Sequence, residues 1–160
     1  MFFSIGDLEA SRKAFESAIS KEPQNTEFLE RLSDVLESSS LHEEAIPYLR
    51  RLVAIKQADY KAHLRLARLC VVTMCFDEAV RHLKMIPADE GGSLGVAQLL
   101  NTVSILKPRH DEARRLLKSG HRGKANYLLG SVYKEVGLLD KARQSYLKAA
   151  EEPAYQAQAA

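Results

Sequence analysis

Tryptophan is absent from this chain of 160 residues, and cysteine, proline and glycine are scarce, with two, five and eight copies. So few prolines and glycines exclude a collagen-like or low-complexity chain. Cys70 and Cys75 are too few for a disulfide-stabilised fold, and they lack the paired spacing of a zinc site or a C-x-x-C redox motif. We therefore expect two reduced thiols, which favours a cytoplasmic location.

Long apolar runs and an excess of one charge are also missing. No segment reaches the roughly 20 apolar residues that span a membrane, and no basic run precedes the apolar start Met1–Phe3, as it would in a signal peptide. The 23 basic and 21 acidic residues give a net charge of +2, which does not by itself indicate nucleic acid or an anionic membrane as a partner. The composition, 46% hydrophobic and 28% charged, is typical of a folded globular chain.

A repeat runs through most of the sequence. Small residues stand 34 positions apart at Ser11, Ala45, Ala79 and Ala113, and Ala142 follows. The fourth residue after each is large and apolar, so that each pair shares one face of a helix. These larger residues are Phe15, Leu49, Leu83, Leu117 and Tyr146. The pattern predicts one amphipathic helix per repeat.

A second helix precedes the first in each of the later repeats. Its marker is a leucine that stands thirteen positions before the small residue, at Leu32, Leu66, Leu100 and Leu129. Turn-forming residues separate the two helices at Ser38–Ser40, Met74–Cys75, Lys107–Pro108 and Gly137. Small residues at the crossing would let the two helices pack closely. The predicted helices span 7–20, 26–38, 41–56, 60–73, 76–86, 93–106, 109–118, 123–136 and 139–151.

This pattern resembles the tetratricopeptide repeat (TPR) family, whose unit is a helix–turn–helix of 34 residues. The clearest copy is Asn126–Tyr133 followed by Gly137, Ala142 and Tyr146. The family tryptophan is replaced throughout. The resemblance implies an all-α fold, a right-handed α-α superhelix of antiparallel helix hairpins in a single domain over residues 1–160. The half repeat and the four repeats that it implies are 1–25, 26–59, 60–93, 94–122 and 123–156.

Both ends of the array are expected to be open. Counting back along the period places the missing helix of the first repeat before Met1. An array with apolar terminal faces is poorly soluble or self-associates. This predicts either that the chain is a fragment of a longer array or that a partner covers its ends, and a self-assembling scaffold is one alternative function.

The resemblance implies a non-enzymatic scaffold that binds a peptide or helix of a partner protein, since in this family the first helix of each repeat lines a concave groove. Composition and spacing reveal no catalytic residue, metal site or cofactor site: the five histidines lack metal-ligand spacing. The residues predicted to line the groove are Glu30, Asp34, Lys61, Leu64, Arg65, Arg68, Gln98, Thr102, Tyr127, Ser131 and Lys134.

The groove charges have two interpretations. Charges at helical spacing are often only the solvated side of a helix, with Asp34 and Arg68 neutralising each other between adjacent repeats. Alternatively, Lys61, Arg65 and Arg68 form a cradle for an acidic peptide or a C-terminal carboxylate. Both interpretations stay open at the level of sequence.

A second basic cluster occupies residues 107–124. It could grip a phosphate backbone, which makes RNA binding an alternative function. Asp111 and Glu112 interrupt the cluster, and neither aromatic residues nor a glycine-rich phosphate loop accompany it. Nucleic acid is therefore a minor candidate. The cations concerned are Arg114, Arg115, Lys118 and Arg122.

Overall fold

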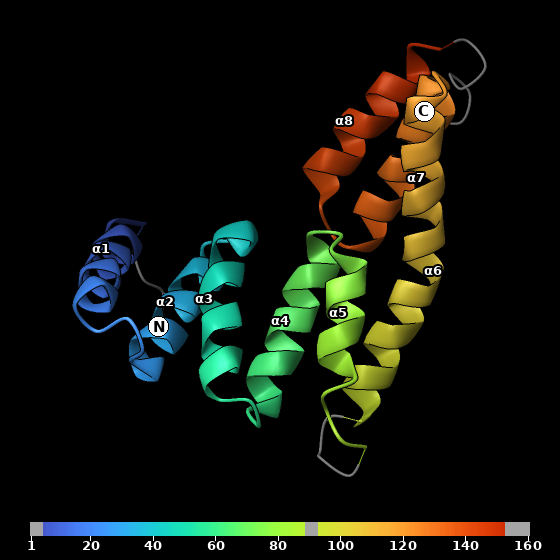
Figure 1. Ribbon diagram of the computed structural model, residues 1–160. Coiled ribbons are helices and arrows are strands. Elements are labelled where there is room, and N and C mark those ends of the chain that lie inside the picture. Colours follow the sequence, from blue (N-terminus) through green and yellow to red (C-terminus); the bar gives the residue numbers. More distant parts are fainter. Residues whose placement is uncertain (1–4, 89–92, 153–160) are drawn as a thin grey trace. The chain divides into compact units, whose positions relative to one another are not determined.

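The computed structural model describes residues 5–88 and 93–152, and these residues form eight helices and no strand (Figure 1). The chain divides into two compact units, Met1–Val96 and Ala97–Ala160. The helices are α1 (Ile5–Lys21), α2 (Thr26–Ser38), α3 (His42–Ile55), α4 (Tyr60–Val72), α5 (Phe76–Leu83), α6 (Ser93–Lys118), α7 (Arg122–Glu135) and α8 (Leu139–Ala150).

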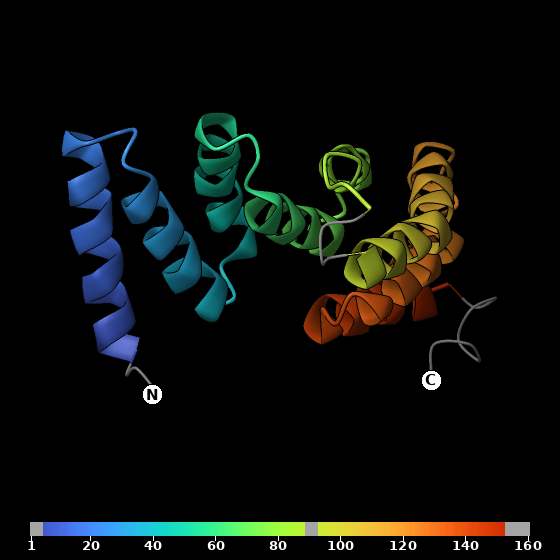
Figure 2. The same ribbon diagram turned by 90° about the horizontal axis from the view of Figure 1, so that it is seen from below.

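Each helix of the first unit packs on the next along the chain, from α1 to α5 (Figure 2). The predicted small residues Ala45 and Ala79 are fully buried, as are the large residues Leu49 and Leu83 that follow them. The leucine of the preceding helix, Leu32 or Leu66, is buried in the same way. The predicted hairpin packing is therefore confirmed in this unit.

Four helices end at residues whose backbone has a positive φ angle, in the left-handed region. Ser40 after α2 and Met74 after α4 have φ angles of 58° and 63°, and Gly120 and Gly137 have 84° and 81°. Each turn closes through a backbone N–H that donates to a carbonyl five residues earlier, for example Cys75 to Cys70 at 2.7 Å. This is the Schellman arrangement, which stops a helix abruptly. It confirms the turns predicted at Ser38–Ser40, Met74–Cys75 and Gly137.

The turn predicted at Lys107–Pro108 is wrong, because α6 runs without a break through both residues. Val103, Leu106 and Ala113 are buried at spacings that keep them on one side of a single helix. Pro108 lies on the exposed side. Its missing N–H leaves a carbonyl unpaired near an exposed part of the helix, where water can hydrate it. The helices predicted at 93–106 and 109–118 are therefore one helix.

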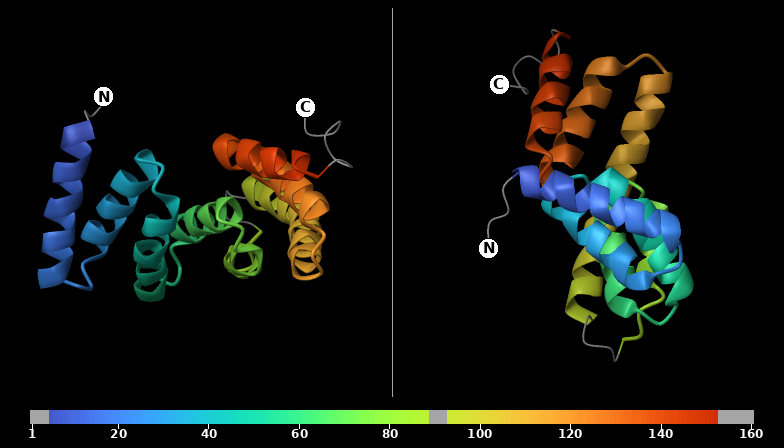
Figure 3. Two further views of the ribbon diagram at one scale, coloured as in Figure 1. Left: turned by 90° about the horizontal axis from the view of Figure 1, so that it is seen from above. Right: turned by 90° about the vertical axis from the view of Figure 1, so that its left-hand side faces the viewer.

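The second unit packs α7 against α8 (Figure 3). Ala125 and Val132 of α7 and Ala142 and Ala149 of α8 are buried. Gly130 lies so close to Tyr146 that a Cβ added there would be 2.7 Å from two ring atoms. By contrast, Leu100 and Leu117 of α6 are 37% and 43% exposed. The prediction that both leucines lie in the core assumed a turn at Lys107–Pro108. Because α6 continues through these residues, that prediction is wrong as well.

Candidate functional site

The predicted groove residues of α2 and α4 meet at Arg65. Its guanidinium donates hydrogen bonds to Asp34 at 2.7 Å and to Glu37 at 2.6 and 3.2 Å. Although burial alone would lower the pKa of Arg65, the hydrogen bond and charges of Glu37 and the charge of Asp34 together raise it. Arg65 of α4 therefore links this helix to the acidic residues of α2. One interpretation of the sequence paired Asp34 with Arg68. In the structure, Asp34 pairs with Arg65 instead.

Arg68 and Lys61 differ from Arg65 in their surroundings. Both are exposed, and among the residues that the structure describes no carboxylate pairs with either. Arg68 lies near the start of α6, where a Cβ added to Gly95 would be 3.7 Å from its Nη2 atom. The Cδ2 atom of Leu64 would be 3.9 Å from the same position. Leu64 and Arg68 thus present an apolar group and a cation side by side.

On the other helix of this face, Glu30 is exposed. The face formed by α2 and α4 therefore carries an ion-paired centre with an acid on one side and two cations on the other. Such an arrangement can bind charged segments.

The remaining predicted groove residues belong to the second unit. The ring of Tyr127 lies 5.7 Å from that of Tyr146, so that this predicted anchor is already packed on a neighbour. Thr102 donates its hydroxyl to the carbonyl of Gln98, and Ser131 donates to that of Leu128. Lys134 and Gln98 are exposed. Each hydroxyl donates its proton to a carbonyl of its own helix, so neither is available to donate a hydrogen bond to a partner.

The second basic cluster lies on exposed helix surface. Arg114, Arg115 and Lys118 are on α6, and Arg122 begins α7. Arg115 pairs with Glu112 at 2.8 Å, within one turn of the same helix. The acidic residue that interrupts the cluster in the sequence thus also neutralises part of its charge.

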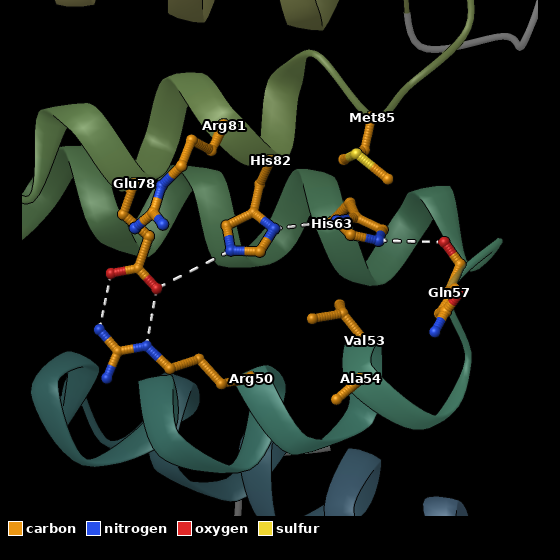
Figure 4. Close-up of a pocket in the computed structure, with 9 residues that line it drawn as sticks. All are labelled: Arg50, Val53, Ala54, Gln57, His63, Glu78, Arg81, His82 and Met85. Carbon is orange, nitrogen blue, oxygen red and sulfur yellow. Dashed lines mark hydrogen bonds and ion pairs between the residues drawn. The ribbon is translucent and has the colours of Figure 1, made fainter.

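A pocket between α3, α4 and α5 escaped the sequence analysis (Figure 4). It has a volume of about 430 Å³. Arg50 of α3 donates two hydrogen bonds to Glu78 of α5, at 2.7 and 2.6 Å. The Nδ1 atoms of His63 and His82 are 3.0 Å apart, so that one donates its proton to the other. His63 is buried, with 4% of its surface exposed.

The electrostatics of this pocket are those of a structural network. The hydrogen bonds from Arg50 hold the pKa of Glu78 below its usual value, and burial lowers the pKa of His82, with the charge of His63 adding to the effect. Burial raises the pKa of the neighbouring Cys70 thiol to about 12. No group of three or more metal-ligating side chains occurs within the described part of the chain. The sequence carries no local signal for the contact between His63 and His82.

Two sequence models of the tetratricopeptide repeat match the chain, over residues 2–62 and 123–153, and together they cover more than half of it. A crystal structure of the TPR domain of P58(IPK) superposes with a TM-score of 0.58 at 17% identity, covering 91% of this chain and 46% of that one. Two crystal structures of MamA superpose with TM-scores of 0.48 at 18% identity, covering 99% and 96% of this chain and 99% and 86% of theirs.

The likeness to P58(IPK) and the helix content confirm the predicted all-α, tetratricopeptide-like solenoid. The chain spans about half the length of that TPR domain. No curated protein matches the chain. None of the helices within residues 5–88 and 93–152 is both long and apolar enough to cross a membrane.

Proposed function

The chain belongs to the tetratricopeptide repeat family, and from this we propose that it is a non-enzymatic protein-interaction scaffold. Its partner is another protein, whose acidic peptide or helix lies along the face formed by α2 and α4. Helical repeat proteins bind through extended surfaces that stacking creates. This function needs neither a cofactor nor a catalytic residue.

The observation that carries the proposal is the contrast between two arginines one helical turn apart on α4. Arg65 is held by Asp34 and Glu37, whereas Arg68 is exposed and faces no carboxylate in the described residues. An acidic group of a partner would have to displace two carboxylates at Arg65 but none at Arg68. Arg68 therefore selects the charge of the partner, and Lys61 extends the cationic surface along α4.

Arg65 has a different role in this account, as a positioning residue. Its bridge between α2 and α4 fixes the distance between the acidic and basic sides of the face. Leu64, which is half-buried beside Arg68, supplies apolar contact area. A buried apolar anchor supplies affinity, and a cation beside it supplies selection for charge.

The test uses two fluorescent, extended peptides that share one sequence except at their charged positions, which are Glu in one peptide and Lys in the other. We expect the acidic peptide to bind the wild-type chain and the basic peptide to bind at least about tenfold more weakly. Arg68→Glu should abolish the preference. Lys13→Glu makes the same charge change on the exposed surface of α1 and should preserve it.

Binding that is equal for the two peptides would contradict the proposal, and so would a preference that survives Arg68→Glu. Circular dichroism of each variant checks that helix content is retained. An equal loss in Arg68→Glu and Lys13→Glu would mean that the peptides respond to net charge alone, which also contradicts a site at α4.

A further inference from the structure

The helix α8 has an apolar side that no described residue covers. Its buried side consists of Ala142, Ser145 and Ala149. At 100° per residue, Leu139 lies beside this buried side, whereas Leu147 is turned about 140–160° away from it, on the outward side of the helix. The two leucines are 66% and 60% exposed. The apolar residues of α8 therefore extend beyond the side that packs on α7.

The two exposed leucines border a groove of about 430 Å³ on the surface of the second unit. Tyr146 contributes its ring, which is half-buried and packs on Tyr127. Because its lining on α8 runs from Leu139 to Leu147, the groove extends along α8 for about two helical turns, beside α7 (Figure 3). An elongated apolar segment fits this shape better than a compact ligand does. The residues that line the groove are Lys134, Leu139, Ala142, Arg143, Tyr146 and Leu147.

The charged residues of the groove are both cations. Lys134 comes from α7 and Arg143 from α8. Both are exposed, and within the described residues neither is paired with a carboxylate. Arg143 stands between Leu139 and Leu147 at intervals of one helical turn. A leucine stripe interrupted by a cation is complementary to a stripe of apolar residues flanked by carboxylates.

We propose that this groove docks an acidic amphipathic helix of a partner protein. The partner's apolar stripe covers Leu139, Tyr146 and Leu147, and its acidic flank pairs with Lys134 and Arg143. Docking of this kind uses anchors spaced at i, i+3, i+4 and i+7, as in other helix-in-groove complexes. The site lies within the second unit, and it does not depend on the face formed by α2 and α4.

Two synthetic amphipathic helices test the proposal. They share one leucine stripe and differ only in its flanks, which are Glu in one and Lys in the other. Binding to the full chain carrying Arg68→Glu, which removes the selective cation of the α4 face, is followed by fluorescence anisotropy. We expect the Glu helix to bind at least about tenfold more tightly than the Lys helix. Arg143→Glu should reverse the order. Lys148→Glu makes the same change on a different side of α8 and should leave the order unchanged.

A further variant tests the apolar part of the groove. Leu147→Ser should weaken binding of the Glu helix while the circular dichroism spectrum stays that of the wild type, because this side chain is mostly exposed. The proposal is overturned if the two synthetic helices bind equally, or if Arg143→Glu and Lys148→Glu have the same effect. Undiminished binding to Leu147→Ser would also overturn it.

Discussion

Gly130 lies in a closely packed contact with Tyr146. A Cβ at this position would lie 2.7 Å from Cδ1 and Cε1 of Tyr146. Gly130→Ala should therefore overpack the contact at a cost of roughly 1–3 kcal/mol, of which the better helix propensity of alanine offsets about 1 kcal/mol. Chemical denaturation should show a net loss of stability of about 1 kcal/mol.

Gly95→Ala is the matched control for this prediction. The nearest atoms to its added Cβ would be at 3.7 and 3.9 Å, which is ordinary van der Waals contact. Helix propensity then dominates, and this variant should be as stable as the wild type or more stable. If Gly130→Ala gained stability as well, the close contact with Tyr146 would be refuted.

The two cysteines should differ sharply in reactivity. Cys75 is exposed after α4, whereas Cys70 is buried and burial raises its pKa to about 12. Because the thiolate is the reacting form, iodoacetamide at pH 8 should label Cys75 in the native chain and Cys70 only after unfolding. Mass spectrometry with and without denaturant measures this. Equal labelling of both thiols in the native chain is the contrary result.

His82 links stability to pH. Burial and, to a smaller extent, the charge of His63 lower its pKa in the folded state. The unfolded chain therefore binds more protons as pH falls below about 6.5, so that stability is greatest above this pH and declines below it. Burial lowers the pKa of His110 as well, with Arg114 adding to the effect, so the second unit contributes a change of the same sign.

Denaturant midpoints at pH 7.5 and 5.5 test this linkage. The wild type should be less stable at pH 5.5, and His82→Gln should reduce the difference without removing it, because His110 remains. A wild-type midpoint that is independent of pH, or that rises on acidification, would rule out the inferred burial of His82.

The helix α6 contains a proline, Pro108, in its interior, where the sequence predicted a turn. Proline in a helix interior lacks the N–H donor and costs about 3 kcal/mol. Pro108→Ala should therefore raise stability, by roughly 1–3 kcal/mol, when thermal or chemical unfolding is compared with that of the wild type. Reduced stability would instead favour a turn at Lys107–Pro108, where alanine would extend a helix that has to end.

The elements also show what local sequence can and cannot predict. Hairpins such as the one formed by α2 and α3 follow from periodicity, because Leu32 and Ala45 must both be buried for the helices to pack. The turn at Pro108 was predicted because a proline usually ends a helix. The helix continues because Val103, Leu106 and Ala113, on the side opposite Pro108, are buried. A local signal therefore fails where tertiary packing decides the outcome.

At the scale of the whole molecule, the candidate site was predictable in its residues but not in its pairings. The family pattern places Asp34, Arg65 and Arg68 on the same face. Which arginine is bound internally depends on side-chain reach between helices, for which the sequence carries no signal. The contact between His63 and His82 was missed for the same reason. The proposed recognition of a partner depends on the exposure of Arg68, which only the three-dimensional structure reveals.

Nuclear magnetic resonance of the ¹⁵N-labelled chain tests the central claim most directly, by mapping where an acidic peptide binds. We predict amide shift changes concentrated on α4 around Leu64 and Arg68, with smaller changes on the facing residues of α2. Shift changes that were confined to other helices, or that persisted at the same α4 amides in Arg68→Glu, would contradict the account.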